Sequence, residues 1–207
     1  MFRIRIRFRK DGDLRFLGHR DLMESFFRLL RRAEVKPAYS QGFHPKPKVS
    51  FPTALPLGVI GENEVLEIEM PEATDAELLR AKLQAHTLPH WDFLQAEAVP
   101  EGEKKARVKS FAYAFAIPLE RREAVRGKIV EVLAQTSIPF QRVGREKTVD
   151  ICKSLLSLAL DGDGALRFTL RGDLNDGCGP RDILALLDIA DLETCGSVLV
   201  RKNVYLF

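Results

Sequence analysis

Strict alternation of apolar and basic residues at the amino terminus constrains the fold of this chain more than any other feature. Residues 2–9 read Phe-Arg-Ile-Arg-Ile-Arg-Phe-Arg. Successive side chains of a β-strand point to opposite faces, so one face is apolar and the other carries Arg3, Arg5, Arg7 and Arg9. Four guanidinium groups in a row either pair with carboxylates or meet a polyanion. The functional interpretation depends on which of these two states holds.

Charge is segregated along the 207 residues, although the formal net charge is only +3. Residues 1–50 hold 13 Lys and Arg against 5 Asp and Glu, whereas residues 51–100 hold 2 against 9. A basic amino-terminal quarter favours an anionic partner such as nucleic acid. The alternative is that the acidic second quarter folds back on the basic first quarter.

The periodicity and the turn signals predict an α+β fold, two tandem ferredoxin-like (βαββαβ) units with antiparallel sheets. The first unit spans 1–99, a linker 100–107, and the second unit 108–207. In the first unit, Asp21 is expected to cap the first helix, with strands at 2–9, 48–51, 64–70 and 91–98 and helices at 21–32 and 75–84. In the second unit, strands are expected at 108–117, 148–160, 165–171 and 198–206, and helices at 120–135 and 181–187.

The expected topology indicates whether carboxylates lie beside the arginine row, because the first and third strands of a ferredoxin-like unit lie side by side and antiparallel. The third strand carries Glu67 and Glu69 on one face. Cross-strand Arg–Glu pairs are therefore expected. Two glutamates against four arginines still leave a positive surplus.

A long loop at 36–48 combines aromatic and basic residues and is longer than a tight connection requires. Single-stranded nucleic acid is bound by stacking on aromatic rings and by cations on its phosphates. We therefore expect a nucleic-acid-binding surface made of Arg3, Arg5, Arg7, Arg9, Arg15, Tyr39, Gln41, Phe43, His44, Lys46 and Lys48. The alternative is that Phe43 and Phe51 belong to the core and the prolines only stiffen the loop.

Other chemistry has less support. His19 and His44 could act as acid and base in RNA cleavage, but neither has a third partner in the sequence. Cys152, Cys178 and Cys195 are widely spaced and odd in number, which argues against disulfides and for a reducing cytoplasm. We expect no metal, no cofactor, no membrane span and no signal peptide.

Several motifs resemble a bacterial domain of unknown function that is fused to, or encoded beside, cobalamin-binding-type radical-SAM proteins. The match covers the whole chain, more loosely in its second half. Its residues are Arg15-Phe-Leu-x-His19, Asp21-Leu-Met23, Tyr39-Ser-Gln-Gly-Phe43, Pro45-x-Pro-Lys48 and Ala54-Leu-Pro-Leu-Gly-Val59. The resemblance implies a radical-SAM protein as partner. The chain itself lacks a cluster-binding cysteine triplet.

Together these observations predict a non-catalytic accessory protein of the cytoplasm. It would bind RNA, from tRNA or rRNA, and present it to a radical-SAM partner. One alternative is an enzyme of tandem ferredoxin-like architecture, a His-dependent endoribonuclease or an RNA-modifying enzyme. The other is an adaptor whose basic face docks on the radical-SAM protein.

Overall fold

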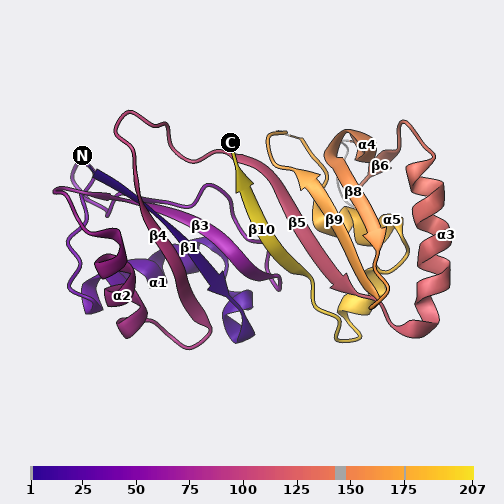
Figure 1. The fold of residues 1–207 in the computed structure, drawn as a ribbon, viewed down its shortest axis with the longest axis horizontal. Coiled ribbons are helices and arrows are strands. Elements are labelled where there is room, and N and C mark those ends of the chain that lie inside the picture. Colours follow the sequence, from indigo (N-terminus) through magenta and orange to yellow (C-terminus); the bar gives the residue numbers. More distant parts are fainter. Residues whose placement is uncertain (1, 143–147, 175) are drawn as a thin grey trace. The chain divides into compact units, whose positions relative to one another are not determined.

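The computed structural model describes residues 2–142, 148–174 and 176–207, and it is α+β (Figure 1). The chain divides into two compact units, Met1–Arg107 and Val108–Phe207. Segment 100–107, expected as a linker, belongs to the first unit.

The sheet of unit 1 has the strand order β4-β1-β3-β2, and every neighbouring pair is antiparallel. Its long helices follow β1 and β3 along the chain. The elements are β1 (Phe2–Lys10), a 3-10 turn η1 (Gly12–Phe16), α1 (His19–Arg32), β2 (Val49–Ser50), β3 (Ile60–Met70), α2 (Ala76–His86) and β4 (Trp91–Val99).

The alternation in β1 produces the core of unit 1. Ile4, Ile6 and Phe8 are buried and form one cluster with Phe26 of α1 and Leu83 of α2, among others. Both helices therefore cover the same face of the sheet, and burial of this apolar surface is the main driving force for the packing. The arginines of β1 lie on the opposite face.

The start of α1 differs from the prediction. The helix begins at His19, after Gly18, which has no side chain to cap it. The prediction that Asp21 is the N-cap is therefore wrong. Asp21 lies in the first turn, where a carboxylate also stabilises the helix through its dipole.

Unit 2 has the strand order β10-β5-β9-β8, again with antiparallel neighbours. A small two-stranded sheet, β6-β7, is formed between α3 and α4 in the sequence. The elements are β5 (Val108–Ala116), η2 (Leu119–Arg121), α3 (Arg122–Leu133), β6 (Pro139–Gln141), β7 (Thr148–Asp150), α4 (Ile151–Ser154), β8 (Leu155–Leu160), β9 (Ala165–Arg171), α5 (Pro180–Leu186), η3 (Ala190–Glu193) and β10 (Val200–Leu206).

The prediction of one continuous strand over 148–160 is wrong. A helical turn, α4, separates β7 from β8. Asp150 is the reason, because its carboxylate accepts a hydrogen bond from the backbone N–H of Cys152 at 3.1 Å and caps the turn. A short polar side chain that binds a nearby N–H favours a cap over a continuing strand.

The three cysteines are free thiols in different surroundings. Cys178 is buried, Cys152 is half-buried and Cys195 is exposed. Burial raises the pKa of the Cys178 thiol to about 11. Since the thiolate is the reactive form, Cys178 stays protonated and inert at neutral pH.

We predict that iodoacetamide at about pH 8 alkylates Cys195 of the folded protein much faster than Cys178, because Cys178 is both buried and protonated. Peptide mass spectrometry after timed quenching measures both rates, and labelling in urea provides the control in which all sites are open. Equal rates in the folded protein would contradict this placement of Cys178.

Candidate functional site

Glu67 organises the arginine face of unit 1. It lies on β3 opposite Arg5 of β1, and its side chain is only 2% exposed. Its Oε1 accepts hydrogen bonds from Arg5 Nε at 3.1 Å and from an Arg5 terminal nitrogen at 2.9 Å. Its Oε2 accepts one from the backbone N–H of Ala106 at 3.2 Å and lies 3.6 Å from Arg3 Nε. One buried carboxylate therefore joins β1, β3 and the segment after β4.

Other acids lie along the same row. Arg5 also donates to the Glu103 carboxylate at 2.8 Å and lies 3.6 Å from that of Glu97, while Arg9 pairs with Asp11. Burial alone would lower the pKa of the Arg5 guanidinium, but its hydrogen bonds to Glu103 and Glu67 outweigh burial and raise that pKa. Acids of unit 1 thus lie beside Arg3, Arg5 and Arg9. Arg7 donates instead to the backbone carbonyl of Asn63 at 3.5 Å, and burial and the neighbouring Arg5 lower its pKa. Of the two predicted glutamate partners, Glu67 pairs with arginine, whereas Glu69 pairs with lysines.

Positive charge remains beside this row. A cavity of about 340 Å³ is lined by Arg3, Lys46, Lys48 and Lys105 together with the two carboxylates of β3, Glu67 and Glu69. Four cations against two carboxylates leave a surplus of two positive charges. Glu69 lies 3.3 Å from Lys48 Nζ and 3.5 Å from Lys105 Nζ. The structure therefore brings three of the predicted site residues, Arg3, Lys46 and Lys48, into one cavity.

The loop that supplies Lys46 and Lys48 is closed at its base and exposed at its tip. Tyr39 and Pro47 form an isolated bridge, and Ser40 hydrogen-bonds Lys46 in both directions, at 2.9 and 3.0 Å. The N–H of Lys48 donates to the carbonyl of Ala38 at 2.7 Å. Gln41, Phe43 and His44 are exposed, and the Phe43 ring is fully so. An aromatic ring is therefore presented to solvent by the loop whose two stems line the cavity.

The remaining predicted residues lie at η1 and the start of α1. Arg15 lies over the Phe16 ring, 4.6 Å from its centroid. His19 contacts the edge of the Phe51 ring, 5.8 Å between centroids, and Phe51 itself packs on Phe8 and Phe26. Phe51 thus joins the core as the alternative interpretation held, whereas Phe43 does not. Among the described residues, no contact joins the two imidazoles of His19 and His44.

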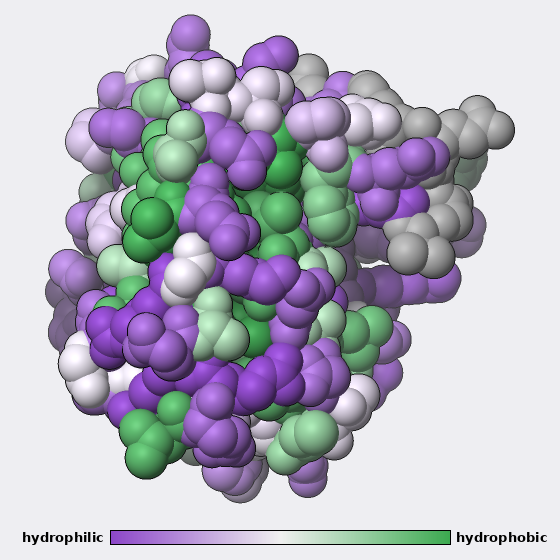
Figure 2. All heavy atoms as spheres, turned by 90° about the vertical axis from the view of Figure 1, so that its right-hand side faces the viewer, coloured by the Kyte–Doolittle hydropathy of each residue, from purple (hydrophilic) through white to green (hydrophobic). Residues whose placement is uncertain are grey.

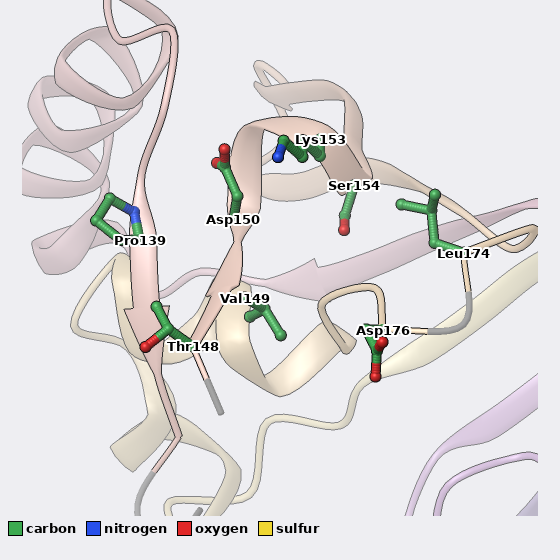
Figure 3. A pocket seen from close by; sticks show the side chains of 8 residues that line it. All are labelled: Pro139, Thr148, Val149, Asp150, Lys153, Ser154, Leu174 and Asp176. Atoms are coloured by element: carbon green, nitrogen blue, oxygen red, sulfur yellow. The ribbon is translucent and has the colours of Figure 1, made fainter. Parts of the chain in front are cut away.

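Unit 2 contains a cavity of about 450 Å³, formed by β6, β7, α4 and the segment after β9 (Figure 3). Two of its polar groups already serve the fold. The Asp150 carboxylate accepts from the N–H of Ile138 and from the hydroxyl of Ser137, and these hydrogen bonds, that from Ile138 first, lower its pKa. The Ser154 hydroxyl accepts from the N–H of Cys178. This cavity therefore offers less for a ligand than the basic one.

The surface around α3 is mixed in hydropathy. Figure 2 shows hydrophobic residues on it standing between hydrophilic ones, and α3 leaves Val130 and Leu133 exposed. Within the described parts of the chain, no group of three or more His, Cys, Asp or Glu side chains is placed to hold a metal ion. No described helix is both long enough and apolar enough to cross a membrane.

Sequence reasoning missed Lys105 and Glu103 as members of the site, because 100–107 reads as a polar linker. The only signal was its run of charged residues, two acidic and then three basic. Glu103 contacts Arg5 and Lys105 contacts Glu69, both on strands far earlier in the chain, so no local pattern reveals them.

We predict that Glu67→Ala destabilises unit 1 by about 3–5 kcal/mol, because it leaves buried guanidinium charge without its partner. Glu97→Ala removes the other cross-strand carboxylate near Arg5, but Glu97 is 57% exposed, so a loss of at most about 1 kcal/mol is expected. Urea unfolding followed by the fluorescence of Trp91, the single tryptophan and part of the unit 1 core, measures both. Equal losses would show that Glu67 does not organise this face.

Comparison with known protein families identifies the family of the chain. The model of a family described as "Uncharacterized protein conserved in bacteria (DUF2344)" matches residues 3–179. These include nearly all of β1, the loop at 36–48 (the motif loop) and the residues that line the basic cavity. A comparison with curated proteins finds no match. The chain belongs to this family of uncharacterised bacterial proteins.

Proposed function

We propose that unit 1 binds single-stranded RNA, with phosphates at the basic cavity and a base stacked on Phe43. The observation that carries the proposal is one loop that combines two kinds of contact. Its second stem places Lys46 and Lys48 in a cavity with surplus positive charge, and its tip holds a fully exposed aromatic ring. Phosphates require cations and bases require exposed π-faces, which is the combination found in single-strand binders.

The cavity, rather than the whole arginine row, is the proposed phosphate contact. Arg5 is held by the buried carboxylate of Glu67. Arg9 pairs with Asp11, and ion pairs near the surface contribute about 0–1 kcal/mol each. Such pairs reduce the attraction for a polyanion without abolishing it. Lys46, in contrast, is exposed and has no ion-pair partner among the described residues.

We also propose that both units are ferredoxin-like. Each sheet has its first strand in the middle, flanked by the last and the third, and helices follow the first and third strands. In this architecture the face opposite the helices is an open sheet surface. The arginine row and the cavity would lie on that face.

The resemblance to a domain associated with radical-SAM proteins gives the proposal its context. We propose that the chain is a non-catalytic accessory protein that presents RNA to such a partner. If the alternative adaptor role were correct, capture of the partner would survive nuclease treatment and would not require the cavity lysines.

We predict that the protein binds a fluorescent oligouridine of about twelve nucleotides with strong salt dependence, since phosphate contacts release counterions. Replacing Lys46 and Lys105 together by Ala should reduce the slope of log K against log salt by about 0.7 for each lysine. The matched control replaces Arg28 and Lys82, exposed cations on the helices of the other sheet face, and should leave the slope unchanged. Fluorescence anisotropy from low to moderate salt measures it.

A second pair of variants distinguishes stacking on Phe43 from the contribution of the lysines. Phe43→Ala should weaken binding by about 1–3 kcal/mol without changing the salt slope, because stacking is lost and no charge is altered. Phe43→Trp should retain affinity. Absence of oligouridine binding at low salt would overturn the proposal.

A further inference from the structure

We infer that Arg3 and Arg5 form an oxyanion site for a phosphate group of a polyanion, and that residues 101–104 occupy this site as a displaceable internal substitute. The inference rests on the proposed function and adds a mechanism to it. The segment after β4, through the Glu103 carboxylate and two backbone carbonyls, would hold the arginines in the free protein and release them when a polyanion binds.

The segment presents several acceptor oxygens to the two guanidiniums, as a phosphate group would. The Glu103 carboxylate accepts from Arg5 at 2.8 Å. Two backbone carbonyl oxygens, of Glu103 and of Lys104, accept from the same terminal nitrogen of Arg3, the latter at 3.0 Å. Paired guanidiniums with several donors match phosphate oxygens in the same way.

The segment is held mainly by these polar contacts. Residues 101–104 read Glu-Gly-Glu-Lys and all are exposed, so apolar burial contributes little to holding them. Lys105 is paired with Glu69 at 3.5 Å and stays at the cavity. The Glu103 side chain is 41% exposed, and exposed ion pairs are weak. Ala106, whose N–H is bonded to the buried Glu67, marks where the firmer attachment begins.

One donor beneath the segment has no acceptor. Arg3 Nε is buried and has no hydrogen-bond partner; the nearest carboxylate oxygen, on Glu67, is 3.6 Å away. Buried donors are nearly always paired in proteins. An oxyanion between Arg3 and Arg5 could satisfy this donor, which the present arrangement does not.

The site is continuous with the proposed RNA contact. Arg3 lines the cavity together with Lys46 and Lys48, so an RNA backbone crossing the cavity would reach Arg3 next. Ligand and segment would then compete for one site, and the apparent affinity of the ligand would be reduced by the occupancy of the segment.

Three single variants test the competition against oligouridine by anisotropy. Glu103→Gln should bind about fivefold more tightly than wild type, the effect of removing one exposed charge-assisted contact. Glu103→Asp keeps the charge but is one methylene shorter and should also bind more tightly. Glu101→Gln removes the same charge two residues away, where no contact with the guanidiniums exists among the described residues, and should change affinity less than twofold, roughly the scale of a distant screened charge.

A second measurement does not depend on RNA. The N–H of Glu103 donates to the carbonyl of Pro100 and that of Ala106 to Glu67, each at 3.2 Å. Hydrogen exchange of these two backbone amides, followed with and without inorganic tripolyphosphate, should become faster when the anion displaces the segment. If tripolyphosphate has this effect but oligouridine does not bind, the oxyanion site stands and the RNA proposal fails. If exchange is unchanged, or if Glu101→Gln and Glu103→Gln tighten binding equally while Glu103→Asp does not, the inference is overturned.

Discussion

The arrangement of unit 1 depends on one buried carboxylate. Glu67 carries a negative charge in the middle of β3, where two arginines of β1 and a backbone N–H of the following segment converge on it. A buried charge is tolerated only with such partners. The consequence is geometric, because Glu67 fixes where Arg3 and Arg5 lie and where segment 100–107 crosses the open face of the sheet.

The distribution of charge on this face follows from that constraint. The carboxylates available to β1 are concentrated around Arg5, which has contacts with Glu67, Glu97 and Glu103. The lysines come from two other segments, the motif loop and the segment after β4, and Glu69 of β3 pairs with Lys48 and Lys105. Positive charge therefore accumulates at the loop side of the face, next to the exposed Phe43.

Much of this could be predicted from sequence because the signals are local. The period of two in residues 2–9 determines which side chains of β1 face the helices, and the order of elements makes β3 its neighbour, so Arg–Glu pairs between the two strands are expected. Which residues pair depends on the register, and the structure pairs Glu67 with Arg5 but Glu69 with Lys48 and Lys105. The break at α4 could not be predicted from periodicity, since apolar residues continue through it and only the Asp150 cap interrupts the strand. The start of α1 at His19 was missed because Gly18 provides no side-chain signal.

The site was predictable only in part, for a different reason. Aromatic and basic residues in 36–48 indicated the loop, and the structure adds that its base is clamped while its tip stays exposed. The contribution of segment 100–107 depends on contacts with residues far away in sequence, and Lys105 and Glu103 therefore remained hidden. Charge composition alone also overestimated the positive charge that the arginine row leaves for a ligand, because it does not show how many carboxylates lie beside Arg5.

Ultraviolet cross-linking of the protein to oligouridine, read out by peptide mass spectrometry, tests the central claim most directly. If unit 1 takes RNA through the basic cavity and the motif loop, cross-linked nucleotides will be found on residues 39–48, with Phe43 as the principal site. Cross-links confined to α1, or to unit 2, would contradict the account.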